Sequence, residues 1–216
     1  MLYIKKKQEP ASLTKYRKQK FSYFDGYPDK DDVRGQLLEE QGHLCAYCMR
    51  RIDKEHMKIE HWYPEDRLND LERLDYKNML GVCEGHLPGT KGTDDTCDTH
   101  KGNELIVVNP QDKTTLEKIQ YSTATGEIFS EDEFIQKDLH ITLNLNSEKH
   151  QLMRNCKETL NAAICEMRKL QQNGQWNRKF IESMLAFYQG ADSAGKKKEY
   201  AGIVVWYLQK KLNQAR

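Results

Sequence analysis

The stretch of sequence that decides the fold runs from residue 45 to residue 103 and contains CAYC (45–48), IEHWYP (59–64), YKNMLGVC (76–83) and TCDTHKGN (96–103). It holds four of the six cysteines of the chain: Cys45, Cys48, Cys83 and Cys97. Because two residues separate the first pair, its thiolates can reach one tetrahedral zinc ion, which the second pair can complete. Four unrelated buried cysteines are the alternative, since free cysteine is among the most buried residue types. We predict a structural Zn²⁺ site.

The fourth zinc ligand has two candidates. Residues 83–86 read CEGH, so His86 can take the place of Cys97. Residues 84–96 form a long insertion rich in Gly, Thr and Asp, where most zinc knuckles have two residues. We prefer Cys97 because of the polar segment that begins with it.

Polar residues that a purely structural zinc site does not need lie between the cysteine pairs. Glu60 and His61 end a short alternating run, and Asn78 precedes a second apolar run. Cys97 opens a short segment that Gly102 closes in the manner of a residue following a helix. The order strand, loop, strand, helix, with E-H-x-x-P, N-x-L and C-D-x-x-K-G, resembles the ββα-metal motif of HNH endonucleases.

The resemblance extends beyond the motif, over roughly residues 33–154. The stretches that carry it are LLEEQGHLCAYC, KIEHWYP, LDYKNML, CDTHKGN, VNP, IQYSTATGEI and ITLNLN. Together they resemble the HNH nuclease subunit of Septu-type anti-phage systems, PtuB, a family that also occurs with some retrons. This resemblance implies a nuclease that works beside an ATPase subunit of the ABC/SMC type, PtuA-like.

The resemblance also implies a role for each motif residue. His61 matches the general base, and Glu60 matches the acidic ligand of a catalytic divalent metal. Asn78 matches the asparagine that pins the loop between the strands and so orients the histidine. The third motif position is open, because the ligand usually follows the cysteine directly, which gives Asp98, whereas His100 comes two residues later.

These residue types suit phosphodiester hydrolysis. An imidazole with a pKa of about 6.5 can activate a water near neutral pH. A hard cation held by carboxylates places positive charge at the scissile phosphate. Such ligands suit Mg²⁺ or Mn²⁺, whereas the thiolates suit zinc.

Length and composition fit one polar domain, or a small domain with helical additions. The chain has 216 residues, of which 38% are hydrophobic and 31% charged, with a net charge of +1. No apolar run approaches the roughly 18 residues of a membrane span, and residues 1–10 lack a signal-peptide pattern. We expect a cytoplasmic protein with no membrane partner. No G-x-x-x-x-G-K-[ST] motif occurs, so P-loop nucleotide binding is left to a partner.

We divide the chain into a basic N-terminal arm (1–30), the HNH module (31–110) and a hairpin with a helical region (111–216). The first 20 residues hold seven basic side chains and one acidic one, a net charge of +6. This arm can follow phosphates, form a solvated tail or dock on a protein. In the module, a helix capped by Asp31 or Asp32 is expected to end at Gln41.

The C-terminal region is expected to begin with a β-hairpin, residues 118–121 against 127–129, and a short helix at 131–138. A long helix follows from its cap Ser147 to about Gln171. Its apolar stripe predicts a packed face: Leu152, Cys156, Leu160, Ala163, Met167 and Leu170. Cys156 and Cys165 are interpreted as packing residues. Two further amphipathic helices, 177–189 and 197–213, can close the core or offer a groove to another protein.

The sequence therefore predicts an α+β protein with a zinc-framed ββα-metal module. The predicted function is metal-dependent hydrolysis of nucleic acid in anti-phage defence, with an ATPase partner. The substrate is DNA or RNA, tRNA included, because such a site recognises a phosphate and not a sugar. A non-catalytic zinc-binding adaptor is the alternative if Glu60, His61 and Asp98 cannot share a metal.

Overall fold

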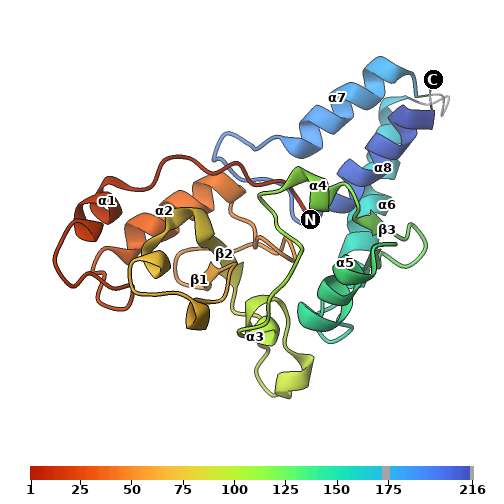
Figure 1. The fold of residues 1–216 in the computed structure, drawn as a ribbon. Helices are drawn as coiled ribbons and strands as arrows, with labels where there is room; N and C mark the ends of the chain where they lie inside the picture. Colours follow the sequence, from red (N-terminus) through yellow and green to blue (C-terminus); the bar gives the residue numbers. More distant parts are fainter. Residues whose placement is uncertain (172–175, 215–216) are drawn as a thin grey trace.

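A computed structural model describes residues 1–171 and 176–214, and it is mixed α+β, as the sequence predicts. At the centre of the predicted module lies an antiparallel hairpin, β1 (Met57–His61) and β2 (Met79–Cys83), with helices packed around it (Figure 1). The register pairs Met57 with Cys83 and His61 with Met79. Every residue of β2 is buried, so both faces of this strand are covered.

Helix α2 (Lys30–Gln41) covers one face of the hairpin. The Gln41 amide donates to the Gly81 carbonyl and accepts from the Gly81 N–H, both at 2.7 Å. Gly42 ends the helix with φ 64°, as predicted. The predicted cap at Asp31 or Asp32 is wrong, because the helix begins at Lys30 and these aspartates lie in its first turn. An acidic side chain stabilises the N-terminal turn from either position, so the charges alone do not fix the start.

Helix α3 (Cys97–Lys101) covers the opposite face and completes the ββα arrangement. The insertion before it, residues 84–96, makes a single 3-10 turn (Gly92–Asp94). Its ends meet where the Thr96 N–H donates to the Gly85 carbonyl at 2.8 Å. Gly85 has φ 70°, and a Cβ there would lie 2.2 Å from the Thr96 oxygen, so this closure requires glycine.

The C-terminal region follows the predicted order with shorter strands. The elements are α4 (Lys113–Leu116), β3 (Gln120–Tyr121), β4 (Ile128–Phe129), α5 (Glu133–Lys137), a π-helical turn (Asp138–Thr142), α6 (Leu152–Leu170), α7 (Arg178–Gln189) and α8 (Ala201–Gln214). Helix α8 packs on both α6 and α7, and these three helices lie at the opposite end of the molecule from α1 (Ala11–Arg17) (Figure 1).

Three predictions about α6 are wrong. Ser147 does not cap it: its hydroxyl accepts from the His150 N–H within a preceding turn, and Gln151, with φ 55°, interrupts the chain before the helix begins. Leu170 is 62% exposed, because the helix extends past Met167, its last buried residue. Cys165 is exposed, since it lies half a turn away from the packed stripe, whereas Cys156 is buried as predicted.

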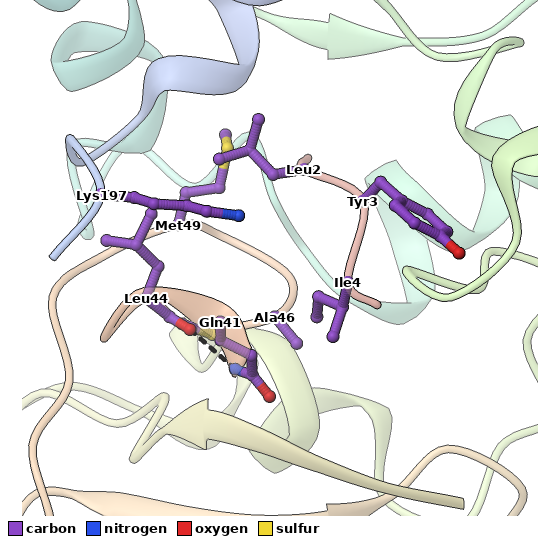
Figure 2. A pocket seen from close by; sticks show the side chains of 9 residues that line it. Leu2, Tyr3, Ile4, Gln41, Leu44, Ala46, Met49 and Lys197 are labelled. Carbon is purple, nitrogen blue, oxygen red and sulfur yellow. Dashed lines mark hydrogen bonds between the residues drawn. The ribbon is translucent and has the colours of Figure 1, made fainter. Parts of the chain in front are cut away.

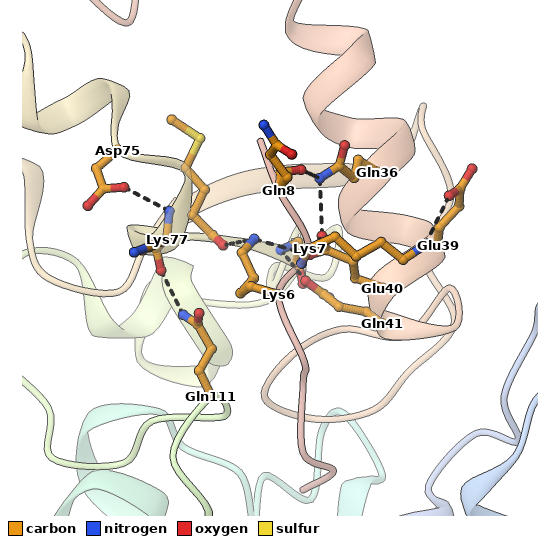
Figure 3. A network of polar contacts seen from close by, with 12 residues as sticks. Lys6, Lys7, Gln8, Gln36, Glu39, Glu40, Gln41, Asp75, Lys77 and Gln111 are labelled. Atoms are coloured by element: carbon orange, nitrogen blue, oxygen red, sulfur yellow. Dashed lines mark hydrogen bonds and ion pairs between the residues drawn. The ribbon is translucent and has the colours of Figure 1, made fainter. Parts of the chain in front are cut away.

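The N-terminal segment is part of the core and not a solvated tail. Met1, Ile4 and Leu13 are buried, and they belong to the same continuous core as the hairpin and the C-terminal helices. Figure 3 shows how Lys6 is held: its ammonium donates to the Met79 carbonyl at 2.9 Å and lies 3.3 Å from the Glu40 carboxylate. No helix within the described residues has the length and apolarity needed to cross a membrane.

Candidate metal centre and active site

The four cysteines predicted to bind zinc come together at one point. Their sulfur atoms all lie within 4.8 Å of one another, and all four side chains are buried. Three of the Sγ–Sγ distances are 3.8 Å (Cys45–Cys97), 3.7 Å (Cys48–Cys83) and 3.7 Å (Cys83–Cys97). A tetrahedron with Zn–S bonds of about 2.3 Å has edges of about 3.8 Å. The thiols are therefore spaced for one tetrahedral ion.

The local backbone explains how this spacing is reached. In the CAYC knuckle the Cys45 N–H donates to the Arg50 carbonyl at 2.8 Å, and the Met49 N–H donates to Cys45 at 3.1 Å. Met49 and Cys97 adopt left-handed φ values of 63° and 57°. Such backbone is costly for residues other than glycine. Both turns direct thiols inward, which indicates a site built for a ligand.

The pKa shifts of Cys45, Cys48 and Cys97 also fit a bound cation. Burial raises the pKa of the Cys45 thiol, but its neighbours donate to its sulfur and bring that pKa well below the usual value. The hydrogen bond with Cys45 raises the pKa of Cys48 and that of Cys97 well above the usual value. A thiol of lowered pKa beside thiols of raised pKa fits a site where a metal takes the place of the protons.

The structure separates the two candidates for the fourth ligand. Cys97 lies in the cluster, whereas the His86 Nδ1 lies 2.7 Å from an Asp95 carboxylate oxygen and the side chain of His86 is 48% exposed. Among the residues that the structure describes, the four cysteines are the only group of three or more Cys, His, Asp or Glu ligands close enough to share an ion, so Glu60, His61 and Asp98 do not form a second group of this kind.

A small cavity beside the knuckle does not compete as a substrate site. Figure 2 shows its lining, which includes Leu2, Ile4, Leu44 and Met49, with the Gln41 side chain at one edge of the group. Its volume is about 10 Å³, room for about one water molecule. The Gln41 amide donates to the Leu44 carbonyl at 2.7 Å and so ties the knuckle to α2.

Glu60 lies on the face of β1 that α3 covers. Only 5% of its side chain is exposed, and one of its oxygens accepts from Lys101 at 2.8 Å and from the Tyr47 hydroxyl at 3.1 Å. Burial raises the pKa of Glu60 to about 9, and the neighbouring Asp98 carboxyl adds to this increase, although Lys101 opposes it. Neighbouring carboxyl groups favour a proton or a cation beside them.

Glu60 and Asp98 therefore fit the predicted divalent cation. They are hard oxygen ligands of the kind that Mg²⁺ and Mn²⁺ prefer, and a cation would relieve the repulsion that raises the Glu60 pKa. His100 points elsewhere, since its Nδ1 lies 3.1 Å from the Thr142 carbonyl oxygen.

His61 is buried in a tight environment, with 4% of its side chain exposed. Its Nε2 lies 2.7 Å from the Arg73 carbonyl oxygen. Because a carbonyl only accepts, Nε2 carries the hydrogen and the lone pair of the neutral ring is on Nδ1. The Glu65 carboxylate lies 3.3 Å from Nδ1, and the Phe24 ring meets the imidazole edge-on at 4.7 Å between centroids. Burial lowers the pKa of His61, which favours the neutral ring.

Asn78 holds the loop that follows β1. Its side-chain oxygen accepts from the Tyr63 N–H at 2.7 Å, and its amide nitrogen donates to the Tyr63 carbonyl at 2.9 Å. A backbone bond of 2.9 Å from the Trp62 N–H to the Asn78 carbonyl closes the same loop. The chain leaving His61 is thus fixed at its first two residues.

Several residues near the site had no predicted role. Tyr47 and Lys101 contact Glu60, and Phe24 and Glu65 cover His61. Lys101 stands in the C-D-x-x-K-G stretch, so its place one helical turn after Cys97 was the available signal. No pattern in the sequence links Phe24 to His61.

Comparison with known proteins finds similarity to an HNH endonuclease. No family model matches the chain. A curated protein of Vibrio cholerae serotype O1 biovar El Tor, named "Retron Vc95 putative HNH endonuclease", is 28% identical to it over 110 residues. The match covers 50% of this chain and 49% of that protein, so the chain spans about half the length of the curated relative. The similarity supports an HNH nuclease family and does not extend to a particular defence system.

Proposed function

We propose that the chain is a metal-dependent HNH endonuclease that hydrolyses phosphodiester bonds. The observation that carries this proposal is the arrangement of Glu60 and His61 at the end of β1. Adjacent residues on a strand point to opposite faces. Glu60 therefore meets Asp98 under α3. His61 points to the other face, where its Nε2 donates to the Arg73 carbonyl and its Nδ1 is left to accept a proton. A purely structural zinc protein has no need for these buried ionisable groups.

In the proposed reaction His61 is the general base. The Arg73 carbonyl fixes the tautomer, so Nδ1 takes a proton from the attacking water and the ring becomes an imidazolium. Asn78 orients the ring by holding Tyr63, two residues beyond it. Glu60 and Asp98 would hold the divalent cation, which would stabilise charge on the phosphate and the leaving oxygen. Asp98, and not His100, is our third motif residue, because Asp98 lies beside Glu60.

We also propose that a partner controls this activity. The support is the cover over His61: Glu65 occupies the space beside Nδ1 where the attacking water must come, and Phe24 packs on the ring. Glu65 has to move before Nδ1 can meet a water. An ATPase partner of the kind found with Septu-type nucleases, in anti-phage defence, would supply that control.

The test is a cleavage assay on duplex DNA, single strands and tRNA with Mg²⁺ or Mn²⁺, with and without a co-expressed PtuA-like ATPase and ATP. We expect cleavage that is lost in Glu60→Gln, which keeps the side-chain shape beside Lys101, and that falls by about 10²–10⁴-fold in His61→Ala, with zinc content and fold unchanged. Wild-type protein that cuts none of these substrates would leave a zinc-binding adaptor as the better description, and cleavage by both variants at the wild-type rate would exclude Glu60 and His61 from the active site. The substrate that is cut decides between DNA and RNA.

A further inference from the structure

Two lysines, Lys58 and Lys101, lie at the Glu60–Asp98 pair, and they differ in their exposure to solvent. Lys58 is two residues before Glu60 on β1, so both side chains project from the same face of the strand. The Lys58 ammonium donates to the Thr99 hydroxyl at 2.7 Å and lies 3.6 Å from an Asp98 carboxylate oxygen. Its side chain is 43% exposed.

Lys101 makes the stronger contact and has no access to solvent. Its ammonium lies 2.8 Å from Glu60, its other contacts are the carbonyls of His61 and Gly102, and 1% of its side chain is exposed. A ligand arriving from solvent cannot replace these contacts without opening the core. Lys101 is therefore an internal partner of Glu60, and its counter-ion whenever Glu60 is ionised.

The Lys58 contacts are of the kind that a ligand can replace. An ammonium has three donors, and here one is directed to Thr99 while the ion pair with Asp98 is long and partly solvated. Exposed ion pairs of this kind contribute little to stability. When Asp98 engages a cation, its charge is shared and Lys58 becomes available to an anion at the same place.

We propose that Lys58 binds a non-bridging oxygen of the substrate phosphate beside the Glu60–Asp98 pair, whereas Lys101 only balances the Glu60 charge. This inference rests on the proposed nuclease function and assigns a substrate-binding residue to it. The ligand class is a phosphodiester of single-stranded or double-stranded nucleic acid, because a lysine recognises phosphate charge and not a base.

The test measures nucleic-acid binding with Ca²⁺ at a fixed concentration in place of Mg²⁺ or Mn²⁺, so that Asp98 can engage a cation and the readout is binding and not cleavage. A fluorescein-labelled oligonucleotide of about 20 nucleotides, as a single strand and as a duplex, is titrated with wild type, Lys58→Met, Lys58→Gln and Lys58→Arg at several salt concentrations. Lys54→Met is the matched control, since Lys54 is exposed in the turn before β1 and lies against Gly35 of α2. Circular dichroism and one zinc ion per chain confirm the fold of each variant.

We expect the neutral variants to bind several-fold more weakly and to lose about 0.7–0.9 from the slope of log affinity against log salt concentration, as one lost phosphate contact predicts. Lys58→Arg should keep the slope, and Lys54→Met should match wild type. In the cleavage assay, Lys58→Met should raise KM.

Two results would overturn the inference. One is a Lys58→Met slope equal to that of wild type. The other is a Lys58→Met variant that needs more Mn²⁺ for half-maximal cleavage but binds nucleic acid normally, which would make Lys58 a positioning residue for Asp98. Wild-type protein that binds with the expected Lys58 dependence but cuts no substrate would instead contradict the nuclease function, so the two failures are distinguishable.

Discussion

Replacing Asn78 with alanine tests whether the pinned loop controls catalysis. The substitution removes both side-chain hydrogen bonds to Tyr63, of 2.7 and 2.9 Å, and leaves the backbone bond from Trp62 to residue 78 in place. The Trp62 indole also stays anchored, because it donates to the Val108 carbonyl at 2.8 Å. We therefore expect a loosened loop and not an unfolded module.

The magnitude follows from those two bonds. A hydrogen bond contributes about 0.5–1.5 kcal/mol net, and both bonds are partly solvated, so the loss is about 1–2 kcal/mol. If His61 acts only when the loop is pinned, that free energy corresponds to a fall in kcat of about 5–30-fold. KM should change little, because Asn78 makes no contact with the Glu60–Asp98 pair or with Lys58.

Hydrogen exchange and kinetics should be measured together. In Asn78→Ala the Tyr63 amide should exchange faster, since its acceptor is gone, whereas the Trp62 amide should stay protected. Asn78→Asp should be at least as slow as Asn78→Ala, because it keeps the acceptor but directs a carboxylate oxygen at the Tyr63 carbonyl.

Asn69→Ala is the matched control for general destabilisation. The Asn69 side-chain oxygen also accepts two backbone hydrogen bonds, of 3.0 Å each, from Leu71 and Glu72. Like Asn78, Asn69 lies in the segment that connects β1 to β2. It should leave kcat unchanged. Equal losses in Asn69→Ala and Asn78→Ala, or a wild-type kcat in Asn78→Ala, would refute the reasoning that pinning orients His61.

Three further predictions address the metals and the cover over His61. Cys83→Ser should lose the zinc ion and the fold of the module, because such sites supply folding free energy directly. Wild-type protein should show Zn–S distances of about 2.3 Å by X-ray absorption. Wild-type protein that is folded but contains no zinc would contradict the zinc assignment. The pKa of Glu60 is raised to about 9 in the metal-free protein, so Mn²⁺ must displace a proton from Glu60. The affinity for Mn²⁺ should therefore rise as the pH increases from 7 to 9. Calorimetric titrations at both pH values measure the two affinities, and equal affinities would contradict the prediction. Glu65→Gln removes a charge that raises the pKa of His61, so the acidic limb of kcat/KM should move to lower pH, and an unmoved limb would rule out this coupling.

The parts of the fold that the sequence predicted are those set by local rules. Both strands of the central hairpin, the short helix at Cys97 and the end of α2 at Gly42 follow from alternation, spacing and backbone preference. The C-x2-C spacing placed two thiols, and the cluster of four followed once the hairpin and α3 met. Helix starts were less accurate, because polar residues near Asp31 and Ser147 can cap more than one turn.

The parts that could not be predicted depend on contacts between distant segments. Phe24 covers His61 from 37 positions earlier in the chain, and Lys101 meets Glu60 only because α3 crosses the hairpin. Both contacts change the chemistry of a motif residue: one lowers the solvent access of the base, and the other balances a buried carboxylate. A motif states which groups are present, whereas their protonation and exposure belong to the folded chain.

In the basic N-terminal segment, too, the contacts of the folded chain decide what a charged residue does. This segment also bears on how access to His61 could be controlled. Lys6 is 9% exposed and is engaged with Glu40, with the Met79 carbonyl and with the Tyr76 ring, 3.5 Å from its centroid. These contacts place Lys6 against the chain on both sides of Asn78, so its charge supports the pinned loop and is not free for phosphate. The loop after α1 brings Phe24 onto His61 itself. A partner that bound the segment between residues 18 and 30 could therefore move Phe24 off the ring without touching the zinc centre, and Nδ1 would meet a water once Glu65 also moved, while the metal frame stayed intact.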